Sequence, residues 1–173
     1  MNEFIKGIKD RRSVRKFKAE VPKKEELEAI IEAGLAAPSG MNRQGAVILA
    51  ITDKEIRDRL AKDNAAVMGR EGDPFYGAPA VLVVLSDKQY PTYLYDGCLV
   101  MENMLLAAHS LGLGAVWIHR AKETFEMDGW KAFLKEKGLE GDYEGIGNCV
   151  VGYPDGELPP VKERLENRVY WAE

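Results

Sequence analysis

Seven residues near the start of the chain, Arg11 to Phe17, read R-R-S-V-R-K-F and carry four positive charges. The whole chain has a formal net charge of -4, so this cluster runs against the overall balance. A guanidinium group grips phosphate oxygens in pairs, and a serine hydroxyl adds another donor. In an extended segment Arg11, Ser13 and Arg15 would point to one side, and Arg12 could reach from the turn before them. The stretch therefore suits either a terminal phosphate or a solvated basic surface, and taken alone it does not separate the two.

A polar loop from Pro38 to Gln44, P-S-G-M-N-R-Q, shifts the balance towards a ligand. Ser39, Asn42 and Gln44 carry uncharged groups that both donate and accept hydrogen bonds. Gly40 allows a ligand to approach the backbone closely. Such a set could read the edge of a heterocycle with alternating carbonyl and N–H groups, although alone it would also suit an ordinary polar turn. Residues that could bind a phosphate and residues that could recognise a heterocycle occur in one chain, which favours a nucleotide or flavin mononucleotide (FMN) as the ligand.

Motifs for several other chemistries are missing from the sequence. It contains no G-x-G-x-x-G, P-loop, H-E-x-x-H, C-x-x-C or G-x-S-x-G pattern. Its two histidines, His109 and His119, lie ten residues apart and do not form a zinc-binding pair. We therefore expect no metal site and list no catalytic side chain, because a bound cofactor would carry out the chemistry.

Length and composition are those of an ordinary globular chain. The chain has 173 residues, of which 46% are hydrophobic and 30% are charged. We expect a chain of this length and composition to form one domain, spanning residues 1–173. The negative net charge argues against a nucleic-acid-binding protein that works by bulk charge. The first residues lack the apolar run of a signal peptide, and polar residues interrupt the best membrane-span candidate, Leu99 to Leu113. We therefore expect a cytoplasmic protein, with Cys98 and Cys149 as buried free thiols.

Hydrophobic periodicity predicts alternating helices and strands, and hence a layered α/β or α+β domain. A T-x-x-E capping box at Thr52 would open the third helix, with a loop expected over 63–77. The helix over 93–111 is apolar nearly all round, which indicates burial against a second subunit. The C-terminal tail carries apolar residues, Val-Tyr-Trp, close to its end, and we expect these side chains to pack against another surface. The predicted helices are 2–10, 22–37, 52–62, 93–111 and 121–137, the last of which Asp128-Gly129 could interrupt. The predicted strands are 46–51, 79–85, 115–118 and 146–153.

Three segments, taken in order, resemble the FMN-dependent nitroreductase family. They are R-R-S-V-R-K-F, A-A-P-S-G-M-N-R-Q and D-G-C-L-V-M-E-N-M-L-L-A-A-H-S-L-G-L-G-A-V-W-I-H, followed by V-K-E-R near the end. The resemblance covers roughly Phe4 to Tyr170. It implies an α+β fold, a three-layer α/β/α sandwich with a mainly antiparallel sheet, built as an interwoven homodimer. Two FMN sites would lie between the subunits, and the tail, about 154–173, would pack on the partner.

The sequence also departs from the family pattern. The family usually continues with Gln-Pro-aromatic where this chain has Gln44-Gly45-Ala46, which affects how the loop packs. The chain is short and lacks the longer helical insertions of larger nitroreductases. The substrate preferences of those enzymes are therefore not carried over.

The resemblance implies roles for particular residues. The basic motif would hold the phosphate and ribityl chain, with Arg11 and Ser13 at the phosphate end and Lys16 in solvent. The Pro38–Gln44 loop would come from the partner subunit, and a backbone N–H near His119 would donate to flavin N5. The implied cofactor-binding set is Arg11, Arg12, Ser13, Arg15, Pro38, Ser39, Gly40, Asn42, Gln44, Trp117, Ile118, His119, Arg120, Lys162 and Arg164.

An FMN enzyme of this type would work by ping-pong hydride transfer. NADH or NADPH would reduce the flavin, and a small electron-poor acceptor such as a nitroaromatic or a quinone would reoxidise it. Arg12 or Arg15 is our hypothesis for stabilising the negative charge that develops on the flavin. Phe75 and Tyr76 are candidates to line the acceptor pocket, or they pack against the following strand. The alternatives are another FMN reaction (dehalogenation, ene reduction or flavin breakdown) and a non-catalytic flavin-binding or redox-sensing protein.

Overall fold

The computed structural model describes residues 2–173 and is built around a four-stranded sheet. The strand order is β1-β2-β4-β3, and each neighbouring pair is antiparallel. The two central strands, β2 and β4, are buried over most of their length, as their continuous apolar runs predict. The predicted antiparallel sheet is therefore confirmed. The strands are β1 (Ala46–Ile51), β2 (Ala80–Asp87), β3 (Gly114–Ile118) and β4 (Tyr143–Gly152).

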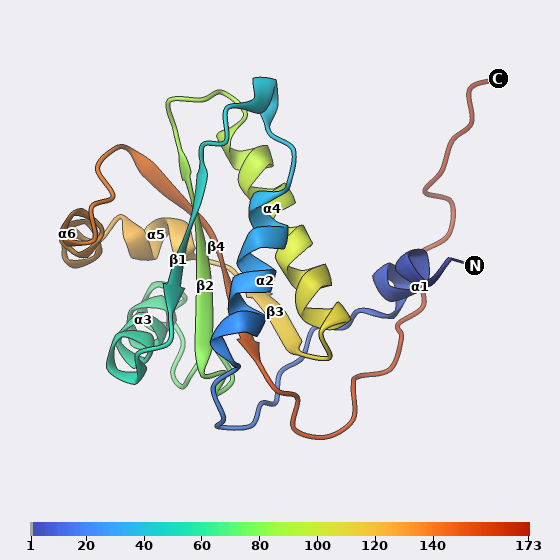
Figure 1. Cartoon of the computed structure of the whole chain (residues 1–173), viewed down its shortest axis with the longest axis horizontal. Coiled ribbons are helices and arrows are strands. Elements are labelled where there is room, and N and C mark those ends of the chain that lie inside the picture. Colours follow the sequence, from blue (N-terminus) through green and yellow to red (C-terminus); the bar gives the residue numbers. More distant parts are fainter. Residues whose placement is uncertain (1) are drawn as a thin grey trace.

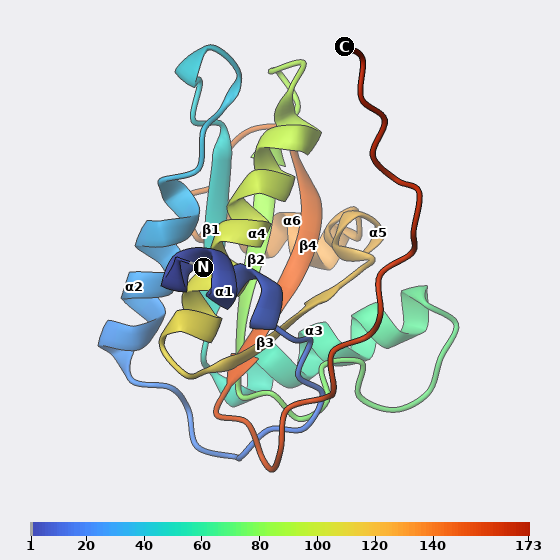
Figure 2. The same cartoon turned by 90° about the vertical axis from the view of Figure 1, so that its right-hand side faces the viewer.

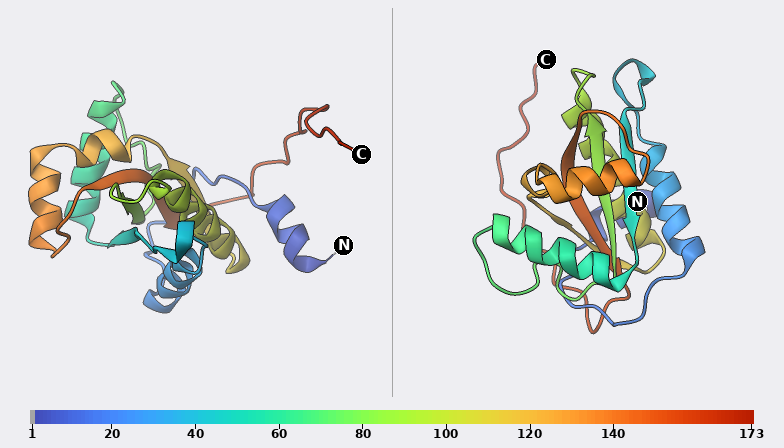
Figure 3. Two further views of the ribbon diagram at one scale, coloured as in Figure 1. Left: turned by 90° about the horizontal axis from the view of Figure 1, so that it is seen from above. Right: turned by 90° about the vertical axis from the view of Figure 1, so that its left-hand side faces the viewer.

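Helices cover both faces of the sheet, which confirms the three-layer α/β/α arrangement (Figure 1). One face carries α2 and α4, and the other carries α3, α5 and α6, as the right-hand view of Figure 3 also shows. Alternate residues of β2 enter the two apolar layers, Leu82 on the α4 side and Val83 on the α3 side. These helices are α2 (Lys24–Leu35), α3 (Lys54–Val67), α4 (Tyr93–Ser110), α5 (Ala121–Phe125) and α6 (Asp128–Glu136).

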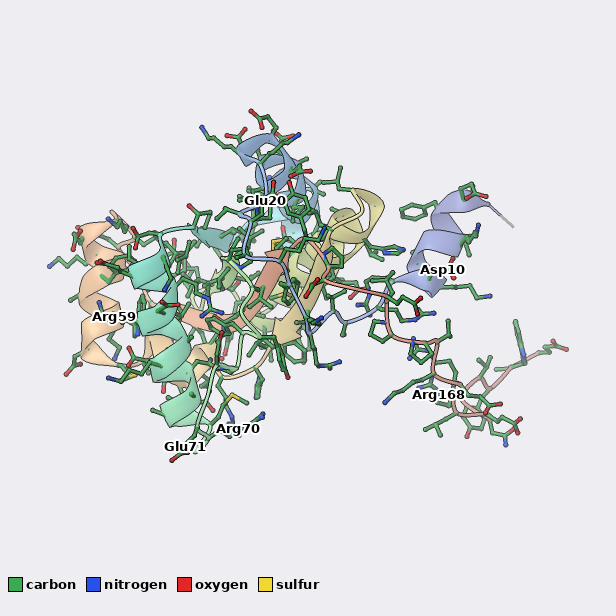
Figure 4. The ribbon with its side chains drawn as sticks, turned by 90° about the horizontal axis from the view of Figure 1, so that it is seen from below. Asp10, Glu20, Arg59, Arg70, Glu71 and Arg168 are labelled. Carbon is green, nitrogen blue, oxygen red and sulfur yellow. The ribbon has the colours of Figure 1, made fainter. Side chains whose placement is uncertain are left out.

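Two segments extend away from this body on the same side (Figures 1 and 3). One is α1 (Glu3–Asp10), in which no residue is buried. The other is the C-terminal tail, which Figure 2 shows as an irregular extended coil and on which Figure 4 labels Arg168 far from the sheet. Tyr170 and Trp171 of the tail are 88% and 84% exposed. Exposed apolar side chains in such a cluster mark a surface that packs against another molecule.

Within one chain, the long helix α4 buries one face and leaves apolar side chains of the other face exposed. Met101 and Met104 enter the core, whereas Leu94, Tyr95 and Leu99 remain exposed. None of the described helices is both long and apolar enough to cross a bilayer.

The boundaries of α3 differ from the prediction at both ends. Asp53, not Thr52, caps the helix, because its carboxylate accepts a hydrogen bond from the Ile56 N–H at 2.9 Å. The helix also continues to Val67, through part of the expected loop. Asn64 and Ala65 keep its inward face buried there, and packing of that face extends the helix.

The two cysteines have different environments. Cys149 is buried in β4 as predicted, but Cys98 is exposed on α4 in the single chain, contrary to the prediction. Burial raises the pKa of Cys149 to about 12. Because the thiolate is the reactive form, we expect a thiol reagent at pH 8 to leave Cys149 unmodified until the protein unfolds. Peptide mass spectrometry checks this, and modification of native Cys149 at the rate of a free thiol would contradict the packing of β4.

Candidate ligand-binding site

A basic cavity lies where the segment after α1 meets the C-terminal tail. Its volume is about 220 Å³. Five of its lining residues are cationic, and none of the described residues that line it is acidic. The structure therefore brings together the predicted basic residues from both ends of the chain. The lining residues are Arg11, Arg12, Ser13, Arg15, Pro159, Pro160, Val161, Lys162 and Arg164.

Strand-like pairing positions the two walls of this cavity. The Val14 N–H donates to the Ala115 carbonyl at 3.1 Å, which fixes the basic segment along the outer edge of β3. The Val14 side chain is buried against Gly114, where a Cβ would lie only 2.8 Å from it. Further along, the Lys18 N–H donates to the Tyr153 carbonyl at 2.9 Å. The tail therefore leaves β4 beside the basic segment and returns its own cations to it.

The basic side chains have different neighbours. The Arg12 guanidinium turns back to α1 and donates to the carbonyls of Lys9 at 2.8 Å and Arg11 at 2.7 Å. These bonds satisfy carbonyls at the end of a helix, so Arg12 has a structural task. Lys16 lies outside the cavity and pairs with Asp155 at 2.9 Å, with 76% of its side chain exposed. This is the solvent position predicted for it.

Phe75 and Tyr76 point to different places. The Tyr76 ring faces the Arg15 guanidinium, with 5.9 Å between the guanidinium carbon and the ring centre, so Tyr76 lies beside the basic cavity. Phe75 is fully buried in the apolar layer under α3, so the prediction that it lines an acceptor pocket is wrong. The turn separates the two side chains because Asp73 accepts hydrogen bonds from the N–H groups of Phe75 and Gly77, each at 2.8 Å.

The end of β3 presents two aromatic rings on one side and a buried side chain on the other. Trp117 is 49% exposed, and its ring meets the exposed His119 ring edge-on at 5.6 Å. The indole lies across Gly147, where a Cβ would be 1.9 Å from the indole nitrogen, so only glycine fits there. The Ile118 side chain is buried in the core. Of Ile118, only the main chain is placed to meet a ligand.

Arg120, the next residue of this turn, has an unusual backbone conformation and a side chain that forms an ion pair. It has a φ of 76°, a left-handed conformation that is uncommon for residues other than glycine and is often found at functional sites. Its guanidinium pairs with Glu123 at 2.5 Å. Burial acts to raise the pKa of Glu123, but its own backbone N–H and the Arg120 guanidinium leave that pKa below the ordinary value. The Arg120 side chain is thus engaged by Glu123.

The Pro38–Gln44 loop is a strained surface loop. Met41, Asn42 and Gln44 have φ values of 52°, 54° and 52°. This left-handed conformation costs about 1–2 kcal/mol for each such residue. Internal bonds maintain it: the Ser39 hydroxyl accepts from the Gln44 N–H at 2.9 Å, and the Gln44 amide donates to Asn42 at 3.0 Å. Strain held in a fixed shape is a mark of ligand-binding loops.

Asp96 anchors this loop, and the sequence analysis missed it. Its carboxylate is 4% exposed and accepts from the Gly40 N–H at 3.0 Å and from the Thr92 hydroxyl at 2.9 Å. Gly40 packs so closely that a Cβ would lie 2.3 Å from the Thr92 hydroxyl oxygen. A single acidic residue at the start of an apolar helix was the available signal.

We expect Asp96→Ala to loosen the loop. It would leave the Gly40 N–H without its acceptor, and an unsatisfied buried group costs about 1–3 kcal/mol, which acts against the strained conformation. Amide hydrogen exchange in the 38–44 segment should speed up, while Glu102→Ala, an exposed carboxylate on the same helix, leaves it unchanged. Unaltered exchange in Asp96→Ala would show that the loop holds its shape without this anchor.

The Pro38–Gln44 loop and the segment that carries Arg11 to Arg15 lie at opposite ends of α4 in one chain (Figure 1). Gly40 bonds to the first turn of α4, whereas Ser13 pairs with Ala115, beyond its last turn. An α-helix rises about 1.5 Å per residue, so the 18 residues of α4 span roughly 27 Å. One chain therefore does not close both predicted halves of the site around the same ligand.

Comparison with known proteins relates this fold to one family. The model of the nitroreductase family matches residues 8–153. The NADPH-flavin oxidoreductase of Vibrio harveyi is 30% identical, over 98% of this chain and 72% of the relative. Two solved nitroreductases with bound FMN align with 100% of both chains. The one from Desulfitobacterium hafniense is 32% identical with a TM-score of 0.87, and the one from Bacteroides fragilis is 27% identical with a TM-score of 0.88.

Proposed function

This chain belongs to the nitroreductase family, and we propose that it reduces small electron-poor acceptors, such as nitroaromatics or quinones, with electrons from NADH or NADPH. It is an FMN-dependent oxidoreductase, as the FMN-bound nitroreductases and the NADPH-flavin oxidoreductase that it resembles support. The observation that carries the proposal is the convergence of basic side chains from both ends of the chain on one cavity.

The donor set of the basic cavity fits the FMN phosphate. A phosphate monoester carries about two negative charges near neutral pH, and the cavity offers five cations, the Ser13 hydroxyl and no acidic lining residue among those described. Within residues 2–173 the Arg11 side chain makes no hydrogen bond or ion pair, whereas Arg12 already bonds to the end of α1. Arg11, Ser13, Lys162 and Arg164 are therefore our proposed phosphate ligands.

The outer edge of β3 continues from this cavity and suits the flavin ring. Val14 pairs with Ala115 at one end of the edge, and the exposed rings of Trp117 and His119 lie at the other. Bound FMN would supply hydride transfer between the nucleotide and the acceptor. The residues of the chain bind and orient it. Arg15, free of the helix contacts that occupy Arg12, is better placed to stabilise negative charge on the flavin.

We propose that the protein is a homodimer and that each site is shared. Exposed apolar side chains on α1, α4 and the tail, among them Phe4, Tyr95 and Trp171, support a large interface. The tail, about 154–173, would pack on the partner, and the partner's Pro38–Gln44 loop would close the site, since the loop of the same chain lies at the far end of α4.

Subunit complementation tests the shared site. We expect Arg11→Ala and Asn42→Ala homodimers each to bind FMN poorly at both sites. Mixed dimers should contain one intact site and one doubly altered site, so co-expressed chains with different affinity tags should regain about half the FMN. Mixed dimers no better than either parent would contradict sharing, as would a monomer that binds FMN at full stoichiometry.

Steady-state kinetics test the reaction class. The FMN-loaded protein should oxidise NADH or NADPH, and a nitroaromatic or a quinone should accelerate the oxidation. A halogenated aromatic should release no halide, since halide release would favour the dehalogenation alternative. A protein that binds FMN but oxidises neither nucleotide with any acceptor would instead be a flavin-binding or redox-sensing protein.

A further inference from the structure

Three fully buried polar side chains converge on the turn that follows β3. Each donates a hydrogen bond to one of three successive main-chain carbonyls. Side chains from α3, α5 and β4 therefore all donate hydrogen bonds to the main chain of a single turn. The bonds are Asn148 Nδ2 to the Ile118 oxygen at 3.4 Å, Asn64 Nδ2 to the His119 oxygen at 3.1 Å, and Thr124 Oγ1 to the Arg120 oxygen at 2.7 Å.

The direction of these carbonyls fixes the direction of the neighbouring N–H groups. In a trans peptide the C=O and N–H groups point to opposite sides. Because the carbonyls of Ile118 and His119 point into the core, the N–H groups of His119 and Arg120 face away from it. Within residues 2–173, neither of these N–H groups has a hydrogen-bond acceptor. Two adjacent donors therefore face outward at the end of the edge that carries the basic segment.

The chain keeps these polar groups buried at a cost in stability. In the described part of the chain, the side-chain oxygens of Asn64 and Asn148 are buried without a hydrogen-bond partner. A buried polar group without a partner destabilises a protein, and an apolar residue of similar size would avoid that penalty. The left-handed Arg120 adds backbone strain in the same turn. In return, the side-chain amides of Asn64 and Asn148 fix the orientation of the turn that follows β3.

We propose that Asn64 is a positioning residue for the flavin ring, and that Thr124, whose Oγ1 accepts from Asn64 Nδ2 at 3.4 Å, holds the Asn64 side chain in place. By holding the His119 carbonyl inward it keeps the Arg120 N–H, next to that of His119, directed at the bound ring. Donors fixed in advance stabilise developing negative charge without reorganising. With the Arg120 N–H directed at the ring carbonyl beside N5, whose oxygen gains electron density on reduction, this turn would favour reduced over oxidised FMN. The inference rests on the proposed function, because it concerns how this chain tunes the same cofactor.

The test compares the affinities of variants for oxidised and reduced FMN. Asn64→Leu removes the donor to the His119 carbonyl, and Thr124→Val removes the hydroxyl oxygen that accepts from Asn64. We expect each to lower the ratio of reduced to oxidised affinity about tenfold, a fall of about 30 mV in the two-electron potential. The affinity for oxidised FMN should change by less than about threefold, because the basic cavity is intact. Thr124→Ser, which keeps the hydroxyl, and Ser86→Ala, which removes a buried hydroxyl on β2, serve as matched controls and should leave the potential unchanged.

A second readout needs no cofactor. In the FMN-free protein, the NMR backbone order parameters of His119 and Arg120 should be lower in Asn64→Leu and Thr124→Val than in the controls. If Asn64→Leu fails to fold, Thr124→Val carries both measurements. An unchanged potential in FMN-loaded variants would overturn the positioning role and leave the proposed function intact. A wild-type protein that rejects FMN would instead overturn the proposed function.

Discussion

Replacing Arg11 by alanine is expected to weaken FMN binding by about ten- to a hundredfold. A hydrogen bond to a charged group contributes about 1.5–3 kcal/mol, and Arg11 lines the cavity with no competing helix contact such as Arg12 has. Riboflavin has no phosphate, so its affinity for Arg11→Ala should match its affinity for the unaltered protein. Titrations that follow flavin fluorescence measure both ligands under the same conditions.

Lys16→Ala is the matched control, since it removes the same charge from the same segment. Lys16 is exposed and paired with Asp155 outside the cavity, so its loss should change FMN affinity by less than about threefold at moderate salt. If Arg11→Ala weakened FMN and riboflavin equally, Arg11 would act through the fold and not on the phosphate. FMN affinity equal to that of the unaltered protein would show that the phosphate clamp is misassigned.

Replacing Arg57 by methionine is expected to lower the free energy of unfolding by about 1–3 kcal/mol, the cost of leaving a buried polar group, here the Ala78 carbonyl, without its partner. Arg57 is 7% exposed and donates to the Ala78 carbonyl at 2.9 Å and to Asp73 at 2.5 Å. Its removal would leave the Ala78 carbonyl without this donor and Asp73 without its cationic partner. Asp73 also holds the turn that carries Tyr76, so that turn should loosen as well. Urea unfolding measures the effect.

Lys54→Met gives the control for this prediction. Lys54 and Arg57 both contact Asp58, but the Lys54 side chain is 87% exposed. Exposed ion pairs contribute about 0–1 kcal/mol, so this variant should unfold nearly as the original protein does. A loss of less than about 1 kcal/mol in Arg57→Met would mean that the turn from Asp73 to Ala78 does not depend on this buried arginine.

Local pattern predicted much of the fold. The apolar runs at 46–51 and 79–85 became strands of an antiparallel sheet, and the 93–111 periodicity became α4. The basic motif and the tail cations came together at one cavity because both segments lie beside the end of β4, as the family resemblance implied. These features depend on short-range periodicity or on motif order, which a single sequence displays.

The residues that hold the loops could not be predicted in the same way. Asp96 bonds to Gly40 and Asn64 bonds to His119, in each case more than 50 positions away in the sequence. Such partners are chosen by tertiary packing, which no local pattern reveals. The error at Phe75 has a related cause, because the Asp73 turn decides which of two adjacent aromatic rings enters the core.

The most direct test of the account is an anaerobic half-reaction. The FMN-loaded protein is mixed with NADH or NADPH in the absence of oxygen, and the visible flavin absorbance is followed. We predict that one of the nucleotides bleaches the flavin and that a nitroaromatic or quinone then restores the absorbance. Flavin that stays bound and coloured with both nucleotides would contradict the assignment of this protein as an FMN-dependent NAD(P)H oxidoreductase.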